Sequence, residues 1–146
     1  MLQEKNIAII GPGVMGKTLA LSLIRTGNLP PEQIAMAGPN ADRLNQLASE
    51  LGVRTFSDNQ AASNAADIVI LAVKPQRLDE ATQTLKGNLS SGKLVISILA
   101  GVPISVLEQK LATRCIVRAM PNTPARIGLG ITVWTKAADV DEAQQQ

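Results

Sequence analysis

The stretch from residue 7 to residue 16 constrains this chain most. The apolar run Ile-Ala-Ile-Ile leads into Gly-Pro-Gly-Val-Met-Gly at residues 11–16, and apolar residues then recur at helical spacing. This pattern is typical of a strand, a tight turn and a helix. Gly11 permits the sharp turn, Gly13 lets a pyrophosphate approach the backbone, and Gly16 lets the helix pack on the strand. The stretch predicts a dinucleotide site; the alternative is a strand-to-helix turn without a ligand.

Composition narrows the class of protein. A chain of 146 residues can bury the core of one domain. The 14 basic and 12 acidic side chains nearly balance, so we expect neither a nucleic-acid partner nor a membrane surface as partner. There is no histidine, and Cys115 is the only cysteine, so we expect no metal site and a buried, unreactive thiol. No apolar run reaches the ~18 residues of a membrane span and no signal peptide is evident, so we expect a cytoplasmic protein.

Short apolar runs alternate with stretches of helical periodicity along the chain. The runs predict strands at residues 5–10, 33–37, 53–56, 68–73, 94–99, 115–119 and 130–134. The periodic stretches predict helices at residues 14–26, 40–51, 57–66, 78–85 and 103–111. Ser57 with Gln60, and Asp139 with Glu142, have capping-box spacing, while the prolines around residues 120–124 predict irregular structure there. The alternation predicts an α/β fold with a doubly wound, mostly parallel, Rossmann-like sheet.

The end of the second predicted strand bears on the choice of nucleotide. In NAD sites an Asp or Glu usually stands there and holds the ribose diol. Here Gly38 takes that place, and the helix that opens at Asn40 can hold a phosphate at its N-terminus. Arg43 is the nearest cation, although it can equally be a solvated helix charge. We therefore expect NADP(H) in preference to NAD(H), and we expect Gly38→Asp to shift the preference toward NAD.

Three further segments follow predicted strands at their carboxyl ends, where ligands bind in such sheets. They are residues 72–75, 99–101 and 120–124. Small residues leave room for a ribose or a nicotinamide ring at Ala72, Ala100 and Gly101. Lys74 is either a ligand-binding residue or a solvated loop lysine. The prolines of the last segment hold Asn122 and Thr123 in one geometry, which serves either a ligand or a rigid turn.

At these residues the sequence resembles the pyrroline-5-carboxylate reductase family. The resemblance is carried by Gly-Pro-Gly-Val-Met-Gly at 11–16, Ala-Val-Lys-Pro-Gln at 72–76, Ser-Ile-Leu-Ala-Gly-Val at 97–102 and Arg-Ala-Met-Pro-Asn-Thr-Pro-Ala at 118–125. It covers nearly the whole chain but only the N-terminal half of a family member. It implies that residues 1–146 are one NAD(P)-binding Rossmann domain, without the helical second domain that joins two subunits and supplies most substrate contacts.

The resemblance also implies an activity and a set of contacts. The activity is NADPH-dependent reduction of 1-pyrroline-5-carboxylate, a cyclic imine carboxylate, to L-proline in proline biosynthesis, by a homo-oligomeric enzyme. The implied cofactor contacts are Gly11, Pro12, Gly13, Val14, Met15, Gly16, Asn40, Arg43, Asn59, Ala72, Val73, Lys74, Pro75, Ala100 and Gly101. The residues implied to close the pocket are Met120, Pro121, Asn122 and Thr123, and no catalytic residue is assigned. We expect this chain to bind cofactor but to turn over substrate poorly or not at all.

Two other interpretations share the glycine-rich turn. One is a related NADP-binding reductase, of the F420-dependent NADP reductase or β-hydroxyacid dehydrogenase type, which should lack the Pro-Asn-Thr-Pro segment. The other is a non-catalytic nucleotide-sensing module. An exposed apolar surface where a second domain would dock argues against the sensing module, and a polar surface there favours it.

Overall fold

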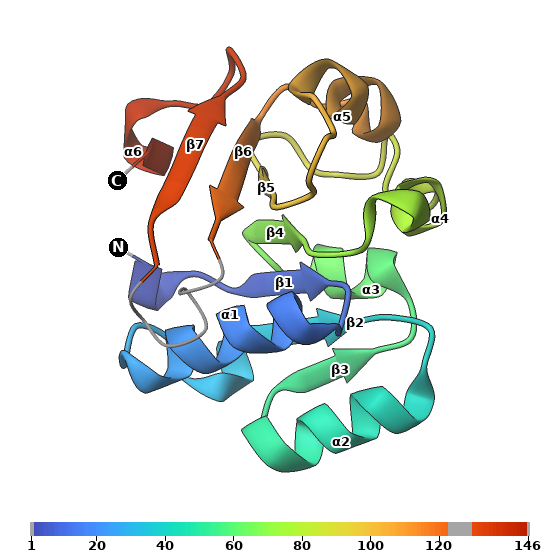
Figure 1. Ribbon diagram of the computed structural model, residues 1–146, viewed down its shortest axis with the longest axis vertical. Coiled ribbons are helices and arrows are strands. Elements are labelled where there is room, and N and C mark those ends of the chain that lie inside the picture. The colour runs from blue at the N-terminus through green and yellow to red at the C-terminus, as the bar shows by residue number, and fades with distance from the viewer. Residues whose placement is uncertain (1, 123–129, 146) are drawn as a thin grey trace.

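The computed structural model describes residues 2–122 and 130–145. Over these residues the chain forms a seven-stranded sheet in the order β3-β2-β1-β4-β5-β6-β7 (Figure 1). All neighbouring strands run parallel except β6 and β7, which are antiparallel. The strands are β1 (Ile7–Ile10), β2 (Ile34–Ala37), β3 (Arg54–Phe56), β4 (Ile68–Leu71), β5 (Leu94–Ser97), β6 (Ile116–Pro121) and β7 (Thr132–Lys136). The prediction of a Rossmann-like, mostly parallel sheet is confirmed.

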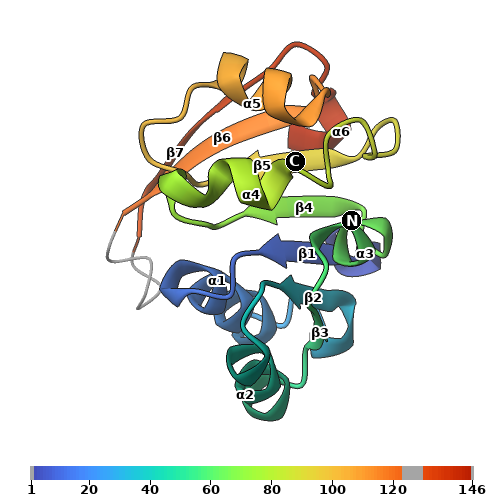
Figure 2. The ribbon, with the colours of Figure 1, turned by 90° about the vertical axis from the view of Figure 1, so that its right-hand side faces the viewer.

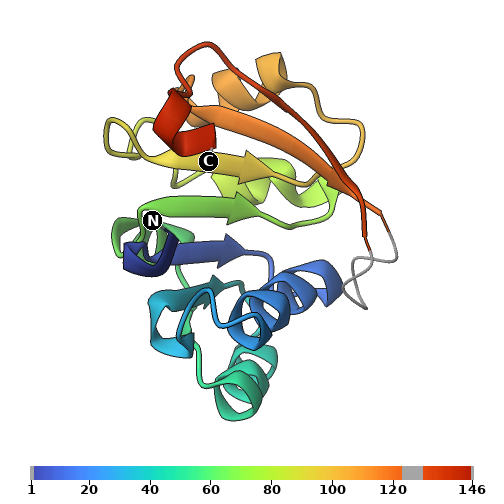
Figure 3. The ribbon, with the colours of Figure 1, turned by 90° about the vertical axis from the view of Figure 1, so that its left-hand side faces the viewer.

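Helices cover both faces of the sheet. They are α1 (Val14–Arg25), α2 (Ala41–Leu51), α3 (Asn59–Asn64), α4 (Leu78–Thr82), α5 (Ile104–Leu111) and α6 (Glu142–Gln145), with 3₁₀ turns η1 (Leu2–Glu4), η2 (Pro31–Gln33) and η3 (Pro75–Arg77). Helices α3, α4 and α5 lie in front of the sheet in Figure 2, and α1 and α6 lie in front of the opposite face in Figure 3. None of the helices in the described part of the chain has the length and apolarity that a membrane crossing requires.

The central strand β1 shows why a continuous apolar run is needed here. All four of its residues are buried, and successive side chains point to opposite faces. Ala8 and Ile10 join the core under α3, α4 and α5, whereas Ile7 and Ile9 join the core under α1 and α2. Strands β2 and β4 flank β1, so the strand order reverses at this point. In open α/β sheets a ligand crevice lies at such a reversal, outside the carboxyl ends of the strands.

Three helix starts differ from the prediction. Asp58, not Ser57, caps α3, because its carboxylate accepts hydrogen bonds from the amides of Gln60 and Ala61. Near the C-terminus the reciprocal pair is Asp141 with Gln144, not Asp139 with Glu142: the Gln144 amide donates to Oδ1 of Asp141 at 2.8 Å, and the Asp141 amide donates back to Oε1 of Gln144 at 3.2 Å. Pro103 is the residue before α5 and not its first helical residue. Correct spacing alone did not identify the capping residue, because several oxygen-bearing side chains compete at each end.

The prediction of irregular structure at residues 120–124 is wrong for its first two residues. Met120 and Pro121 belong to β6, paired with Val133 and Thr132 of β7. The returning strand β7 supplies this pairing, and a proline at the end of a strand removes only one amide donor from it. Residues 123–124 lie outside the described residues.

The thiol of Cys115 is buried, as predicted. Cys115 is 6% exposed, and it packs with Leu94, Val117 and Val140. The Sγ–H group donates to Oε1 of Gln144 on α6 at 3.3 Å, and Nε2 of Gln144 donates to the carbonyl of Gly92 at 2.9 Å. Burial raises the pKa of the Cys115 thiol, and the hydrogen bond with Gln144 partly opposes this. The described structure therefore gives this cysteine a packing role.

Candidate functional site

The turn after β1 is built around Gly11. Its φ of +110° lies where side-chain-bearing residues rarely occur. An ideal Cβ at this position would lie 2.7 Å from the carbonyl carbon and oxygen of Ala72 and 2.8 Å from the amide nitrogen of Val73. The Gly11 amide also donates to the carbonyl of Ala37 at 2.9 Å. Gly11 is thus required where the ends of β1, β2 and β4 meet.

The other two glycines of the turn have opposite surroundings. An ideal Cβ on Gly16 would collide with the carbonyl oxygen of Gly11 and would lie 3.2 Å from Cγ2 of Ile9. Gly13 is the residue before α1, and an ideal Cβ there would meet nothing within 4 Å. Gly11 and Gly16 are therefore needed by the fold, whereas the missing side chain of Gly13 leaves an open space at the N-terminus of α1.

That space suits a diphosphate. Gly13 supplies no side-chain cap to the first amides of α1, so these N–H groups can donate to a ligand. The helix N-terminus carries a partial positive charge, and no carboxylate stands in the first turn of α1. The residues present thus fit the pyrophosphate of a dinucleotide. Because Gly13 has no side chain, the space beside the first amides of α1 stays open for it.

A cleft of about 210 Å³ lies beside this turn. Its lining comes from the carboxyl ends of β1, β2 and β4, from the segment that follows β4 and from the first residue of α3: Ile10, Gly11, Pro12, Gly13, Ala37, Gly38, Pro39, Asn59, Ala72, Val73, Lys74, Arg77, Glu80 and Ala81. A larger groove of about 540 Å³ lies between α4 and α5, among charged and amide side chains such as Asp79, Lys86 and Lys110. We place the candidate site in the smaller cleft, because it lies where the strand order reverses.

The structure brings seven of the predicted cofactor residues together along this cleft: Gly11, Pro12, Gly13, Asn59, Ala72, Val73 and Lys74. The remaining predicted residues do not line it: Val14, Met15, Gly16, Asn40, Arg43, Pro75, Ala100 and Gly101. Of the residues predicted to close the pocket, Met120, Pro121 and Asn122 lie at the carboxyl end of β6, two strands beyond β4 in the sheet, and Thr123 lies outside the described residues. A site that held all of the predicted residues would cross the carboxyl ends of five neighbouring strands, from β2 to β6.

Two charged residues of the cleft were not predicted. Arg77 ends η3 and Glu80 lies in α4, and Nη2 of Arg77 donates to Oε1 of Glu80 at 2.8 Å. In the sequence, opposite charges three residues apart indicate only an ordinary ion pair on the exposed face of a helix, so they gave no sign of a site. The segment after β4 brings both residues over the strand ends, and Asn59 from α3 joins it by donating to the carbonyl of Ala81 at 3.1 Å.

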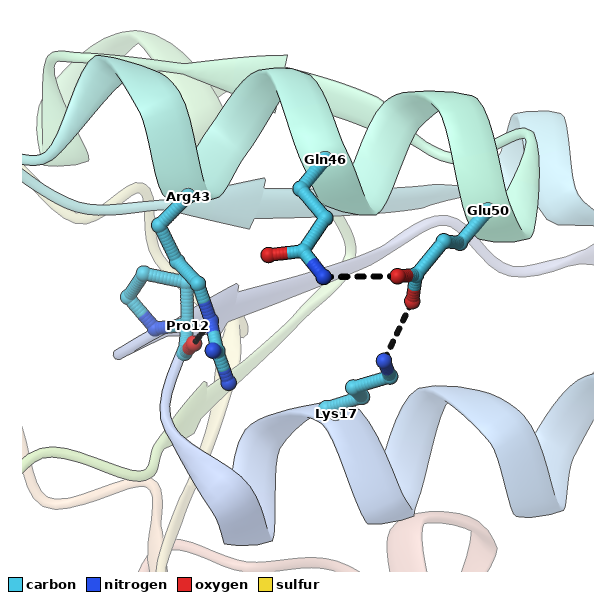
Figure 4. Close-up of polar contacts among 5 residues, drawn as sticks. All are labelled: Pro12, Lys17, Arg43, Gln46 and Glu50. Carbon is cyan, nitrogen blue, oxygen red and sulfur yellow. Dashed lines mark hydrogen bonds and ion pairs between the residues drawn. The ribbon is translucent and has the colours of Figure 1, made fainter.

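Helix α2 is joined to the glycine-rich turn (Figure 4). Oδ1 of Asn40 accepts the Arg43 amide at 2.9 Å, which confirms Asn40 as the residue that caps α2. Nε of Arg43 donates to the carbonyl of Pro12 at 3.0 Å. Farther along the same helices, Lys17 of α1 pairs with Glu50 of α2, and Gln46 donates to Glu50 at 2.7 Å. These hydrogen bonds lower the pKa of the Glu50 carboxyl.

The edge strand β7 exposes apolar side chains on both faces of the sheet, because the consecutive residues Val133 and Trp134 point to opposite faces. Val133 (71% exposed) and Trp134 (50%) belong to β7. Ile131 (70%) directly precedes β7, and Met120 (39%) lies on the neighbouring strand β6. Because β7 pairs with β6 on one side only, its other side is unpaired among the described residues. Apolar exposure of this kind marks surfaces that other protein segments cover.

Comparison with known proteins places the chain in a family. The family model described as NADP oxidoreductase coenzyme F420-dependent matches residues 6–101. The pyrroline-5-carboxylate reductase of Synechocystis is 41% identical over 127 residues, covering 87% of this chain and 47% of the relative. The Escherichia coli enzyme of the same name is 38% identical over 136 residues, covering 92% of this chain and 51% of the relative. The chain thus spans about half the length of the curated relatives it matches.

Solved structures agree with this. A pyrroline-5-carboxylate reductase from Coxiella burnetii superposes with a TM-score of 0.90 at 36% identity, covering 97% of this chain and 53% of that one. The Plasmodium falciparum pyrroline carboxylate reductase with NADP bound gives a TM-score of 0.86 at 27% identity, covering 99% of this chain and 53% of that one. Prephenate dehydrogenase from Aquifex aeolicus, at 20% identity and a TM-score of 0.76, shares the fold. The chain therefore belongs to the nucleotide-binding oxidoreductase family described as NADP oxidoreductase coenzyme F420-dependent, and it is similar to the pyrroline-5-carboxylate reductases.

Proposed function

We propose that this chain is the cofactor-binding domain of an NADPH-dependent reductase that converts 1-pyrroline-5-carboxylate to L-proline. The observation that carries the proposal is the open cradle at Gly13 in a chain 41% identical to a protein of that name. In this proposal residues 1–146 form one NAD(P)-binding domain, and the substrate contacts come largely from elsewhere.

The resemblance to the reductases suggests what each group of residues does. The turn at residues 11–16 holds the pyrophosphate, Asn40 and Arg43 lie on the side of the adenosine 2′-phosphate, and Asn59 contacts the adenosine. Residues 72–75 and 100–101 line the ribose and the nicotinamide, and residues 120–122 close the pocket; the predicted fourth residue, Thr123, lies outside the described residues. The lining of the cleft by residues 11–13, 59 and 72–74 supports the roles assigned to these residues.

The chemistry is reduction of a C=N bond. Bound NADPH would supply the hydride, and the residues of this chain would orient the nicotinamide and exclude water. No histidine is required if the imine arrives protonated, and we assign no proton donor to this chain. Our proposal of NADP(H) over NAD(H) rests on Gly38 standing where a diol-binding carboxylate would be, and on the NADP bound to the similar Plasmodium protein.

Calorimetric titration of the 146-residue chain with NADPH and with NADH tests the proposal. We expect NADPH to bind more tightly, and proline formation to be negligible until the second half of a matched relative is added as a separate chain. Absence of binding by either nucleotide would contradict the cofactor assignment. Substantial proline formation by the chain alone would contradict the division of labour between the two halves.

A second candidate follows from the description of the matched family, which names coenzyme F420. In that case the acceptor or donor of the hydride would be coenzyme F420 and not a cyclic imine. The chain, together with the second half of a relative, is incubated with NADPH and either coenzyme F420 or 1-pyrroline-5-carboxylate. This separates the two candidates, because only the true hydride acceptor should cause NADPH to be oxidised.

The exposed apolar residues along β7 favour either reductase over a sensing module that acts alone. Ile131 and Val133 are about 70% exposed, which is costly for a surface that nothing covers. We propose that a further domain or subunit covers them. Light scattering before and after adding the second half of a relative measures whether the two associate.

A further inference from the structure

Gly38 and Pro12 meet at the rim of the cleft. Gly38 directly follows β2, its amide donates to the carbonyl of Phe56 at 3.2 Å, and both Gly38 and Pro12 line the cleft. An ideal Cβ on Gly38 would lie 2.5 Å from Cδ and 2.6 Å from Cγ of Pro12. Real Cβ atoms do not approach other heavy atoms so closely, so any side chain at position 38 would collide with the proline ring.

The ring of Pro12 cannot easily move out of the way. It is closed onto its own backbone nitrogen, so its position follows the backbone of the turn. That backbone is held on both sides of the ring: the Gly11 amide donates to the Ala37 carbonyl at 2.9 Å, and the Pro12 carbonyl accepts from Nε of Arg43 at 3.0 Å (Figure 4). The backbone amide of Arg43 donates to Oδ1 of Asn40, which places Arg43 in the first turn of α2.

We infer that Pro12 determines nucleotide specificity by excluding a side chain from position 38. A carboxylate at the end of β2 is what holds the ribose diol in NAD sites. With Pro12 in place, a carboxylate side chain at position 38 has no room. The absence of a group that would bind the ribose diol therefore follows from Pro12 as well as from Gly38 itself. The inference rests on the proposed nucleotide site, and it revises the expectation that Gly38→Asp alone shifts preference toward NAD.

A double-mutant cycle tests the inference. The variants are P12A, G38A, G38D, P12A/G38A and P12A/G38D, and each is measured for its melting temperature without nucleotide and for its dissociation constants with NADPH and NADH. We expect G38A alone to lower the melting temperature by about 5 °C or more, and to lower it much less in the P12A background. We expect G38D alone to weaken both nucleotides or to prevent folding. P12A/G38D should shift the ratio of the two dissociation constants toward NADH by about tenfold or more.

The G38A pair keeps the test decisive if the aspartate variants do not fold, because it adds only a methyl group. An equal loss of melting temperature from G38A in both backgrounds would overturn the inference, as would a full shift toward NADH by G38D with unchanged melting temperature. If the unsubstituted chain binds neither nucleotide, the proposed function fails. The melting-temperature cycle still reports whether Pro12 excludes a side chain at position 38.

Discussion

The carbonyl oxygen of Gly11 lies so close to Gly16 that it would collide with the Cβ atom of any side chain there. The sixth residue of the turn thus packs directly against the first. Through this contact α1 lies close to the end of β1, and the N-terminus of the helix faces the cleft. The same turn contains Gly13, where an added Cβ would meet nothing within 4 Å, so the packing of the turn requires Gly11 and Gly16 but not Gly13.

Gly16→Ala should destabilise the protein strongly. The added methyl group collides with backbone, which cannot rotate away as a side chain can, so we expect a loss of about 1–3 kcal/mol or more in the free energy of unfolding. Urea denaturation followed by circular dichroism measures this loss. Gly13→Ala is the matched control, because it adds the same atom at a position with open space. Equal stability of the two variants would contradict the packing described for α1.

Gly13→Val should separate folding from binding. We expect a loss of about 1 kcal/mol in the free energy of unfolding, because glycine is preferred to valine at the residue before a helix, while the added side chain meets open space and causes no collision. The affinity for NADPH should fall by at least about tenfold, because the isopropyl group would occupy the space where the diphosphate must approach. Calorimetry gives the affinity and thermal melting gives the stability. Unchanged affinity would contradict the position assigned to the nucleotide.

Lys93→Met should change how stability depends on pH. Lys93 is 8% exposed, and its Nζ donates to the carbonyl of Ser63. Burial lowers the pKa of Lys93 below its usual 10.5, an effect that Asp67 partly opposes. In the affected range the unfolded chain binds this proton more tightly than the folded protein, so stability rises as pH increases toward 10.5. The variant should lose this rise.

Urea titrations at a series of alkaline pH values measure the effect. Lys86→Met is a suitable control, since Lys86 is exposed. If the Lys93 variant and the unsubstituted protein gain stability equally with rising pH, then Lys93 is not the group responsible.

Cys115 should contribute a pH dependence of opposite sign. Burial holds the pKa of its thiol above the usual 9.0, so the unfolded chain loses the proton first as pH increases. Stability should therefore fall above 9.0, and Cys115→Ala should remove that part of the fall.

The same burial should make the thiol slow to react. We expect a maleimide to label the folded protein slowly at neutral pH and the denatured chain rapidly. Gln144→Ala should accelerate labelling of the folded protein, because Gln144 joins the four-residue helix α6 to both Cys115 and Gly92. A labelling rate that Gln144→Ala leaves unchanged would show that α6 does not protect the thiol.

Local sequence signals predicted the elements near the site well. Asn40 caps α2 and Gly52 ends it in a left-handed conformation, because a side-chain acceptor and a residue without Cβ satisfy the helix ends by local geometry alone. The prediction failed at Asp58, Asp141 and Pro121. At the first two, neighbouring side chains compete for the same amides, and at Pro121 the partner strand β7 determined the outcome.

The sequence by itself determined the strand–turn–helix at residues 7–25, the alternation that builds a parallel sheet, and the absence of a carboxylate at position 38. These depend on residues close together in the chain. The tertiary structure alone decided that Arg77 and Glu80 line the cleft, that Arg43 holds the carbonyl of Pro12, and that Pro12 fills the space beside Gly38. The reason is geometric: each of these contacts joins segments from different strand ends, and only the order of strands in the sheet brings those ends together.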